Sequence, residues 1–135
     1  MPAKDRHHTV VVHALINAGW QVTGEQVAII LTERRRWVDI GAEKAAENAA
    51  ILVEVKGFEN MLSPIDYLAA AVGKYILYRV ALAYLLTPIS LYMAVPIQAY
   101  HGILSEEIGR ELIDRLNIKL LVFDIEREEI VRWIT

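Results

Sequence analysis

The chain has 135 residues, a formal net charge of −3 and no cysteine. This length suits one domain, spanning residues 1–135, with a hydrophobic core of its own. The lack of cysteine excludes disulfides, thiolate metal sites and thiol nucleophiles. The acidic balance excludes the overall basic field that is typical of non-specific nucleic-acid binders, so a DNA-binding role needs a local positive patch.

Two stretches bear on the location of the protein. The N-terminus is polar and charged through His8, unlike a signal peptide. The most apolar stretch, residues 68–86, carries Lys74 and Arg79 near its middle. Each of these charges would cost about 3 kcal/mol in a bilayer on insertion scales. We therefore expect no membrane span and a soluble, cytoplasmic protein.

The N-terminal half is predicted to form a helix followed by three strands. Apolar residues recur at helical spacing over residues 3–18, and Gly19 supplies a stop. Residues 26–32, 37–41 and 51–58 are short apolar runs of the kind that form strands. The arginines at 34–36 turn the chain between the first two strands. The alanine-rich residues 42–49 indicate a loop with one helical turn.

The C-terminal half begins with a long helix over residues 64–86, capped by Ser63 and with Pro64 at its first position. Apolar side chains surround nearly its whole circumference, so we expect one side to pack on the sheet and another on a second subunit, as in a homodimer. Residues 89–95 predict a buried strand, and Ser105 is expected to cap a helix over 106–116. Residues 118–123 and 130–134 predict a hairpin around an acidic turn.

Asp39 and the segment Glu54-Val55-Lys56 are the candidates for chemistry. Alternation along a strand puts Glu54 and Lys56 on one face, and pairing with the preceding strand brings Asp39 beside them. Two close carboxylates repel unless they take up protons or a cation, and Mg²⁺ or Mn²⁺ suits the gap. Lys56 would then orient the attacking water or stabilise the phosphate charge.

This arrangement is the D…(D/E)xK pattern of metal-dependent nucleases, in which Asp39 and Glu54 would be the metal ligands. The motif is short and made of common residues. An alternative interpretation is a strand hairpin with one solvated face and an ordinary Glu–Lys pair.

Three further residues are candidates for contacts with a substrate. Arg36, with Arg34 and Arg35, gives a local positive patch beside the Asp39 strand, although a solvated turn is the alternative. Lys4 and Arg6 would extend that patch. Lys74 and Tyr78 lie one turn apart on one stripe of the long helix. The four histidines form no metal set, and we expect His7 and His8 to be an exposed pair.

The predicted order is helix, three strands, helix, strand, followed by C-terminal additions that end in a β-hairpin. This α-β-β-β-α-β order is the core order of the restriction-endonuclease-like fold, in the α/β (α+β) class. The element order and the D…(D/E)xK motif are independent indications of this fold, because the order is read from hydrophobic periodicity and the motif from residue chemistry.

Several segments also match a known family. The most specific is Val38-Asp39-Ile40-Gly41-Ala42-Glu43-Lys44, and Val53 to Phe58 follows it. The others are Ala3-Lys4-Asp5 with His8, Ala14-Leu15, Gly19-Trp20, Ser63-Pro64, Gly73 to Arg79, Leu121 to Asp124 and Glu129 to Ile134. Over essentially its full length, the sequence resembles the XisH family, the fdxN-element excision controlling factors of cyanobacteria.

The resemblance implies a part in programmed excision of a DNA element during heterocyst differentiation. There a site-specific recombinase is thought to cut and rejoin the strands, while XisH and a small companion, XisI, act as controlling factors. Carried over by position, Asp39 and Glu54 are metal ligands and Lys56 is the catalytic-type lysine. Glu43 lies on the same string without an assigned role. Lys74 stands where related exonuclease-type nucleases place a glutamine, and a lysine contacts phosphate but cannot accept a hydrogen bond.

Two functional hypotheses follow. The first is a Mg²⁺-dependent DNA endonuclease, or a nuclease-fold factor that nicks DNA, built on Asp39, Glu54 and Lys56. The second is a non-catalytic protein of the same fold that binds a XisI-like protein or the recombinase. The acidic balance, Lys74 and the apolar long helix support the second, but between the two we favour a nuclease-like fold with an intact metal triad. An α/β domain of unrelated role is the third alternative, and the full-length resemblance disfavours it.

Overall fold

The computed structural model describes residues 7–59 and 61–135. Its strands form one six-stranded sheet in the order β1-β2-β3-β4-β5-β6. The elements are α1 (His8–Asn17), β1 (Gln21–Ile30), β2 (Arg35–Lys44), η1 (Ala45–Glu47), β3 (Ala49–Val55), α2 (Pro64–Tyr84), β4 (Ser90–Pro96), α3 (Ile97–His101), η2 (Ile103–Ser105), α4 (Glu107–Leu116), β5 (Leu120–Asp124) and β6 (Glu129–Ile134). The predicted α-β-β-β-α-β core with a C-terminal hairpin is confirmed.

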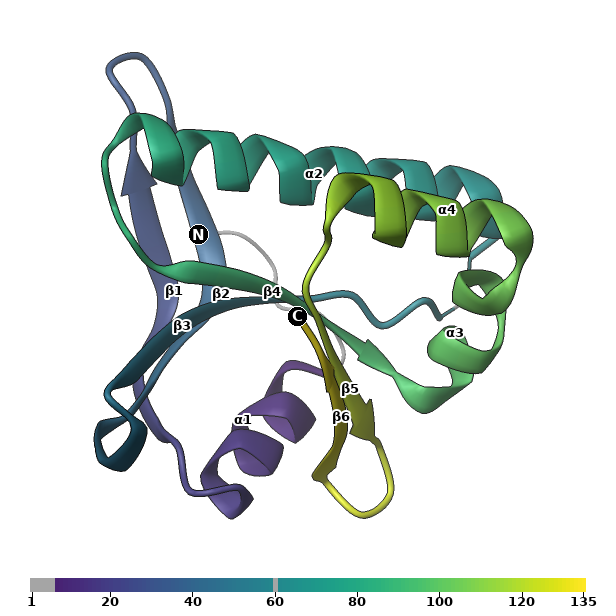
Figure 1. Ribbon diagram of the computed structural model, residues 1–135, viewed down its shortest axis with the longest axis horizontal. Helices are drawn as coiled ribbons and strands as arrows, with labels where there is room; N and C mark the ends of the chain where they lie inside the picture. The colour runs from purple at the N-terminus through teal and green to yellow at the C-terminus, as the bar shows by residue number, and fades with distance from the viewer. Residues whose placement is uncertain (1–6, 60) are drawn as a thin grey trace.

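Antiparallel pairs flank a parallel centre of the sheet. β1, β2 and β3 pair antiparallel in sequence, and β5 pairs antiparallel with β6. β4 lies parallel to both β3 and β5. Parallel neighbours need crossover connections. Figure 1 shows that α2 and α4 cross on the same side of the sheet, with α1 on the other.

Two hydrophobic layers cover the two faces of the sheet. The larger layer joins the sheet to α2 and includes Leu68, Tyr75 and Met93. The smaller layer lies under α1 and includes Leu15 and Phe123. β4 contributes alternate residues to both layers, so it is buried on both faces, as central parallel strands are.

Helix α2 begins as the sequence predicts. The Ser63 hydroxyl accepts a hydrogen bond from the Asp66 N–H at 3.4 Å, and Pro64 occupies the first turn. Farther along, the buried Tyr75 hydroxyl donates to the Leu91 carbonyl at 2.7 Å and accepts from the Lys119 N–H at 3.2 Å. These bonds fix α2 to β4 and to the start of β5. Within the described ranges, no helix is long and apolar enough to cross a membrane.

The first two strands are longer than predicted, and the expected loop at 42–49 is wrong in its first part. β1 already begins at Gln21, and β2 continues to Lys44. Glu43 pairs with Gln21 on one side and with Ala50 on the other. Pairing on both sides therefore outweighs the low strand propensity of this alanine-rich segment. β3 ends at Val55, before the predicted end at residue 58.

Two local predictions are also wrong. Ser105 does not cap α4, because its hydroxyl donates to the carbonyls of His101 and Gly102 at 2.8 and 2.7 Å. His7 and His8 are buried instead of exposed. Their Nε2 atoms lie 2.7 Å from a Glu59 carboxylate oxygen and 2.6 Å from a Glu25 oxygen, so partners on other segments stabilise them. Residues 3–6, with Lys4 and Arg6, lie outside the described residues.

Candidate active site

The candidate site lies where β2 and β3 separate. The Cα pairing of these strands runs as far as Ile40 with Val53. Beyond this pair, hydrogen bonds to side chains replace the backbone hydrogen bonds between the two strands. The Asp39 N–H donates to Glu54 Oε1 at 3.3 Å, and the Val55 N–H donates to Asp39 Oδ2 at 2.7 Å. These two hydrogen bonds hold the carboxylates of Asp39 and Glu54 next to each other.

Two lysines face this carboxylate pair. Lys56 Nζ lies 3.9 Å from Glu54 Oε2, and Lys74 Nζ lies 3.0 Å from the same oxygen. Lys56 follows the end of β3, yet its N–H donates to the Ala94 carbonyl at 2.9 Å and so continues the parallel ladder. The structure thus brings together the three residues predicted to carry the chemistry, and α2 adds Lys74.

Burial gives Glu54 an unusual protonation equilibrium. The Glu54 side chain is 2% exposed. Burial, followed by the neighbouring charge of Asp39, raises the pKa of Glu54 from 4.5 to about 7, although Lys74 and Lys56 act in the opposite direction. For Lys74, burial lowers the pKa, but the charge and hydrogen bond of Glu54 leave that pKa above its usual value. Glu54 therefore titrates near neutral pH beside a lysine that stays charged.

The three predicted substrate contacts lie close together. The ring of Tyr78 is in contact with the cations of Arg36 and Lys74. Lys74 Nζ lies 5.6 Å from the centroid of the Tyr78 ring, and Arg36 Cζ lies 5.9 Å from it. Tyr78 itself is buried, and its hydroxyl donates to the Trp37 carbonyl at 3.1 Å. Tyr78 thus connects α2 to β2 and positions the two cations, of which Arg36 is exposed.

The donor atoms fit a divalent cation with few protein ligands. Asp39 and Glu54 offer carboxylate oxygens, which Mg²⁺ prefers, and Mg²⁺ commonly binds one or two carboxylates and keeps several waters. No group of three or more His, Cys, Asp or Glu side chains suited to a metal occurs in the described part of the chain. A cation here would therefore be held by these two carboxylates. The two lysines already balance their charge, so a cation would compete with Lys74 for Glu54.

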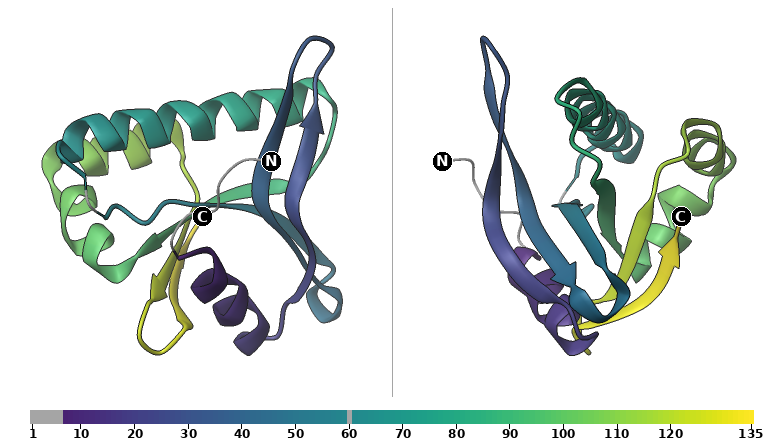
Figure 2. Two further views of the ribbon diagram at one scale, coloured as in Figure 1. Left: turned by 180° about the vertical axis from the view of Figure 1, so that it is seen from behind. Right: turned by 60° about the vertical axis from the view of Figure 1, so that its left-hand side comes forward.

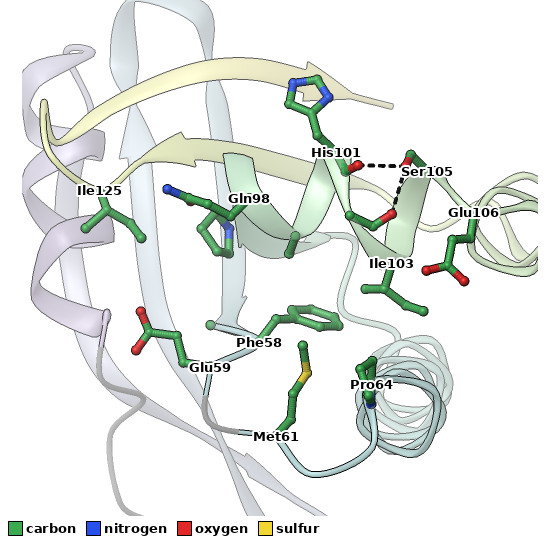
Figure 3. Close-up of a pocket in the computed structure, with 14 residues that line it drawn as sticks. Phe58, Glu59, Met61, Pro64, Gln98, His101, Ile103, Ser105, Glu106 and Ile125 are labelled. Atoms are coloured by element: carbon green, nitrogen blue, oxygen red, sulfur yellow. Dashed lines mark hydrogen bonds between the residues drawn. The ribbon is translucent and has the colours of Figure 1, made fainter.

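A separate cavity lies near the carboxyl ends of the parallel strands. It measures about 660 Å³, and its lining begins at Gly57, directly after Lys56 in the chain. Figure 3 shows Phe58, Met61 and Ile103 on one side of it and Gln98 and His101 on another. Ligands of open α/β sheets often bind at this edge. The sequence carried no signal for this cavity, because its walls come from segments far apart in the chain.

Gln26 is a second feature that the sequence did not reveal. The β1–β2 register pairs Glu25 with Ile40 and Val27 with Val38, so Gln26 lies opposite Asp39. Gln26 has a φ of 56°, which is uncommon for a residue other than glycine. Both polar atoms of its side-chain amide are buried without a hydrogen-bond partner in the described structure. No periodicity or motif marks such a residue in a sequence.

The element order and the six-stranded sheet define a protein of the mixed α+β class, with the carboxylate–lysine cluster at its β2–β3 junction. A family model described as XisH protein matches residues 1–131. The chain belongs to the XisH family, which confirms the resemblance seen in the sequence.

Two solved structures are similar over nearly the whole chain. One is described as an XisH family protein from Nostoc punctiforme, with 35% identity and a TM-score of 0.89, covering 97% of this chain and 100% of that one. The other is described as an fdxN element excision controlling factor protein from Anabaena variabilis, with 35% identity and a TM-score of 0.90, covering 98% and 100%. A search of curated proteins finds no match.

Proposed function

We propose that this XisH family protein is a controlling factor in the excision of a DNA element and acts on DNA phosphodiesters through a divalent metal site. The first part follows the description of the Anabaena variabilis relative. The second part rests on one observation: Asp39, Glu54 and Lys56 meet at the β2–β3 junction. The protein would act on DNA in the cytoplasm.

Each residue of the site has a role in this proposal. Asp39 and Glu54 would hold Mg²⁺ or Mn²⁺, and the ion would supply Lewis-acid activation of a phosphodiester and of water. Lys56 is placed to orient the water or to stabilise charge on the phosphate. Lys74 and Arg36 would contact neighbouring phosphates. Because the pKa of Glu54 is about 7, the carboxylate form that binds a cation becomes dominant only above neutral pH.

One observation favours a second candidate function. Lys74 Nζ lies 3.0 Å from Glu54 Oε2, so two ammonium groups balance two carboxylates without a metal. In this alternative the cluster is structural, and the protein controls a site-specific recombinase by binding it or a XisI-like partner.

DNA nicking separates the two functions. Supercoiled and linear DNA would be incubated in Mn²⁺ with the wild type, Glu54→Gln and Lys56→Ala, and with Glu129→Gln as a control at an exposed glutamate. The proposal expects nicking by the wild type and the control, and at least a hundredfold less in the two site variants. Nicking that Glu54→Gln retains in full would show that the site is not its source.

Mn²⁺ binding, measured by calorimetry, provides a second readout that does not require turnover. The proposal expects binding by the wild type and its loss in Asp39→Ala, with both proteins folded by circular dichroism. If the folded wild type neither binds Mn²⁺ nor nicks DNA, alone or with a XisI-like protein, the second function replaces the first.

A further inference from the structure

The C-terminal half of α2 presents a stripe of exposed apolar side chains. Leu77, Val80 and Tyr84 are 51%, 61% and 74% exposed. Their spacing of three and four residues places them on one side of the helix. The other side packs in the core through Tyr78 and Leu82. The apolar side chains that surround α2 are therefore buried in the core on one side of the helix and exposed on the other.

The β1–β2 hairpin forms a second wall beside this stripe. In Figures 1 and 2 the tip of the hairpin projects beyond the sheet, next to the C-terminal end of α2. A groove of about 760 Å³ lies between them, which we call the α2–hairpin groove. It is lined by Leu31, Arg34, Arg36, Leu77, Val80, Ala81 and Tyr84. Contiguous exposed apolar surface with a polar rim marks protein interaction sites.

The rim of the α2–hairpin groove is positively charged, although the chain carries a net charge of −3. Arg34, Arg35 and Arg36 follow one another at the hairpin end, and all three are exposed. None of the described residues that line the groove is acidic, and the adjoining turn carries one carboxylate, Glu33. Arginine binds carboxylates through paired, charge-assisted hydrogen bonds. The complementary surface is therefore apolar at its centre and acidic at its edge.

We propose that the α2–hairpin groove binds an amphipathic helix of a partner protein, with apolar side chains in the groove and carboxylates on the arginines. From Leu77 to Tyr84 the stripe covers two helical turns, roughly 10 Å at 1.5 Å per residue. Apolar anchors at i, i+3 or i+4, and i+7 of a docked helix span the same length. A DNA backbone would use the arginines but would place its phosphates against the apolar stripe, so a protein partner fits better. The groove shares Arg36 with the proposed contacts to DNA, so the test below changes Val80 and Arg34 and leaves Arg36, Asp39 and Glu54 intact.

A displayed library of single-helix peptides tests the proposal with defined probes. Selections would use the wild type, Val80→Asp, and Ile108→Asp as a matched control, because Ile108 is 48% exposed on α4. Clones enriched on the wild type are expected to carry apolar residues at i, i+3 or i+4, and i+7 with flanking Asp or Glu. Their affinity should fall at least tenfold for Val80→Asp and for Arg34→Glu, and stay unchanged for Ile108→Asp.

Four results would overturn the proposal: no binders on the wild type, binders that Val80→Asp retains, binders without acidic flanks, or binders unaffected by Arg34→Glu. Sedimentation would also overturn the proposal if the wild type were a dimer and Val80→Asp a monomer, because the groove would then hold a second copy of the chain.

Loss of DNA binding in Val80→Asp and Arg34→Glu, with no peptide bound by the wild type, would assign the groove to nucleic acid. Val80→Asp should leave the nicking activity unchanged, so this test is independent of the metal site.

Discussion

Lys74 on α2 and Glu54 near the end of β3 form an ion pair, with Nζ 3.0 Å from Oε2. The pair makes the long helix part of the candidate site, although the D…(D/E)xK pattern draws only on strands. It also places a protein cation where a metal ion would otherwise neutralise Glu54. Removing one partner of a buried pair leaves the other charge uncompensated, which is costly.

Lys74→Met should therefore lower the stability of the metal-free protein at pH 8. We expect a loss of about 1–3 kcal/mol in the free energy of unfolding, below the range for fully buried pairs because the Lys74 side chain is 33% exposed. Urea titration in EDTA measures this loss. Arg115→Met, which breaks an exposed pair with Glu111, is the control and should cost less than about 0.5 kcal/mol. Equal losses in both variants would contradict the special role of Lys74.

The same substitution should strengthen metal binding. Without Lys74, Glu54 Oε2 has lost its nearest competing cation, so we expect the Mn²⁺ affinity of Lys74→Met to rise about tenfold, equivalent to about 1.4 kcal/mol. Calorimetry at pH 8 measures this change. An affinity that falls would mean that Lys74 supports the ion instead of competing with it.

The stability of the protein should depend on the protonation of Glu54. Its pKa is raised from 4.5 to about 7, so the folded state holds this proton more tightly than the unfolded state. The resulting stabilisation is fully present below pH 4.5 and is lost as the pH rises to about 7. Since each pKa unit corresponds to about 1.4 kcal/mol, the loss amounts to about 3 kcal/mol.

Glu54→Gln lacks this titration and provides the comparison. The free energy of unfolding of the wild type minus that of Glu54→Gln should decrease between pH 5 and pH 7 and then level off. Urea titrations at several pH values in EDTA measure both proteins. Parallel pH profiles would show that Glu54 does not titrate in this range.

Tyr75→Phe should destabilise the protein by about 1–3 kcal/mol. The change removes a buried hydroxyl that donates to the Leu91 carbonyl and accepts from the Lys119 N–H, leaving both backbone groups without that partner. Thermal and urea unfolding measure the effect. Tyr84→Phe removes the hydroxyl of a tyrosine that is 74% exposed and should change stability by less than about 0.5 kcal/mol. A Tyr75→Phe variant as stable as Tyr84→Phe would contradict this assignment.

Two glycines should respond oppositely to alanine. A Cβ at Gly109 would overlap the Ile103 carbonyl oxygen and lie 2.9 Å from Leu104 Cα, so Gly109→Ala forces η2 and α4 apart. We expect a loss of about 1–3 kcal/mol. A Cβ at Gly73 meets nothing within 4 Å, and alanine in a helix is more favourable than glycine by up to about 1 kcal/mol. Gly73→Ala should therefore raise the melting temperature, and a decrease would contradict the exposed helical position of Gly73.

The sequence predicted the parts of the fold that depend on local signals. Ser63 and Pro64 marked the start of α2 because capping needs only neighbouring residues. Alternation placed Glu54 and Lys56 on one side, and the prediction that Asp39 joins them is confirmed by two hydrogen bonds. The ion pair of Lys74 with Glu54 was not predicted, because it depends on how α2 lies across the sheet.

Features that depend on distant partners escaped prediction. Ala42 and Glu43 form part of β2 because β1 and β3 pair with them on both sides, which local propensity does not report. His7 and His8 are buried because Glu59 and Glu25 supply hydrogen bonds from other segments. Ser105 is the last residue of η2, which the sequence pattern did not reveal, and its hydroxyl bonds back to His101 and Gly102 instead of forward to α4.

The parallel pairing of β3 with β4 has a consequence for the order of folding. A hairpin such as β1–β2 closes over a short loop, whereas β3 and β4 meet only after the chain between them, including all of α2, has crossed the sheet. Lys74 lies in the middle of that crossover, so its ion pair with Glu54 forms no earlier than the docking of α2 on the sheet. A folding intermediate that contains only the β1–β2 hairpin would therefore carry Asp39 without Glu54, Lys56 and Lys74.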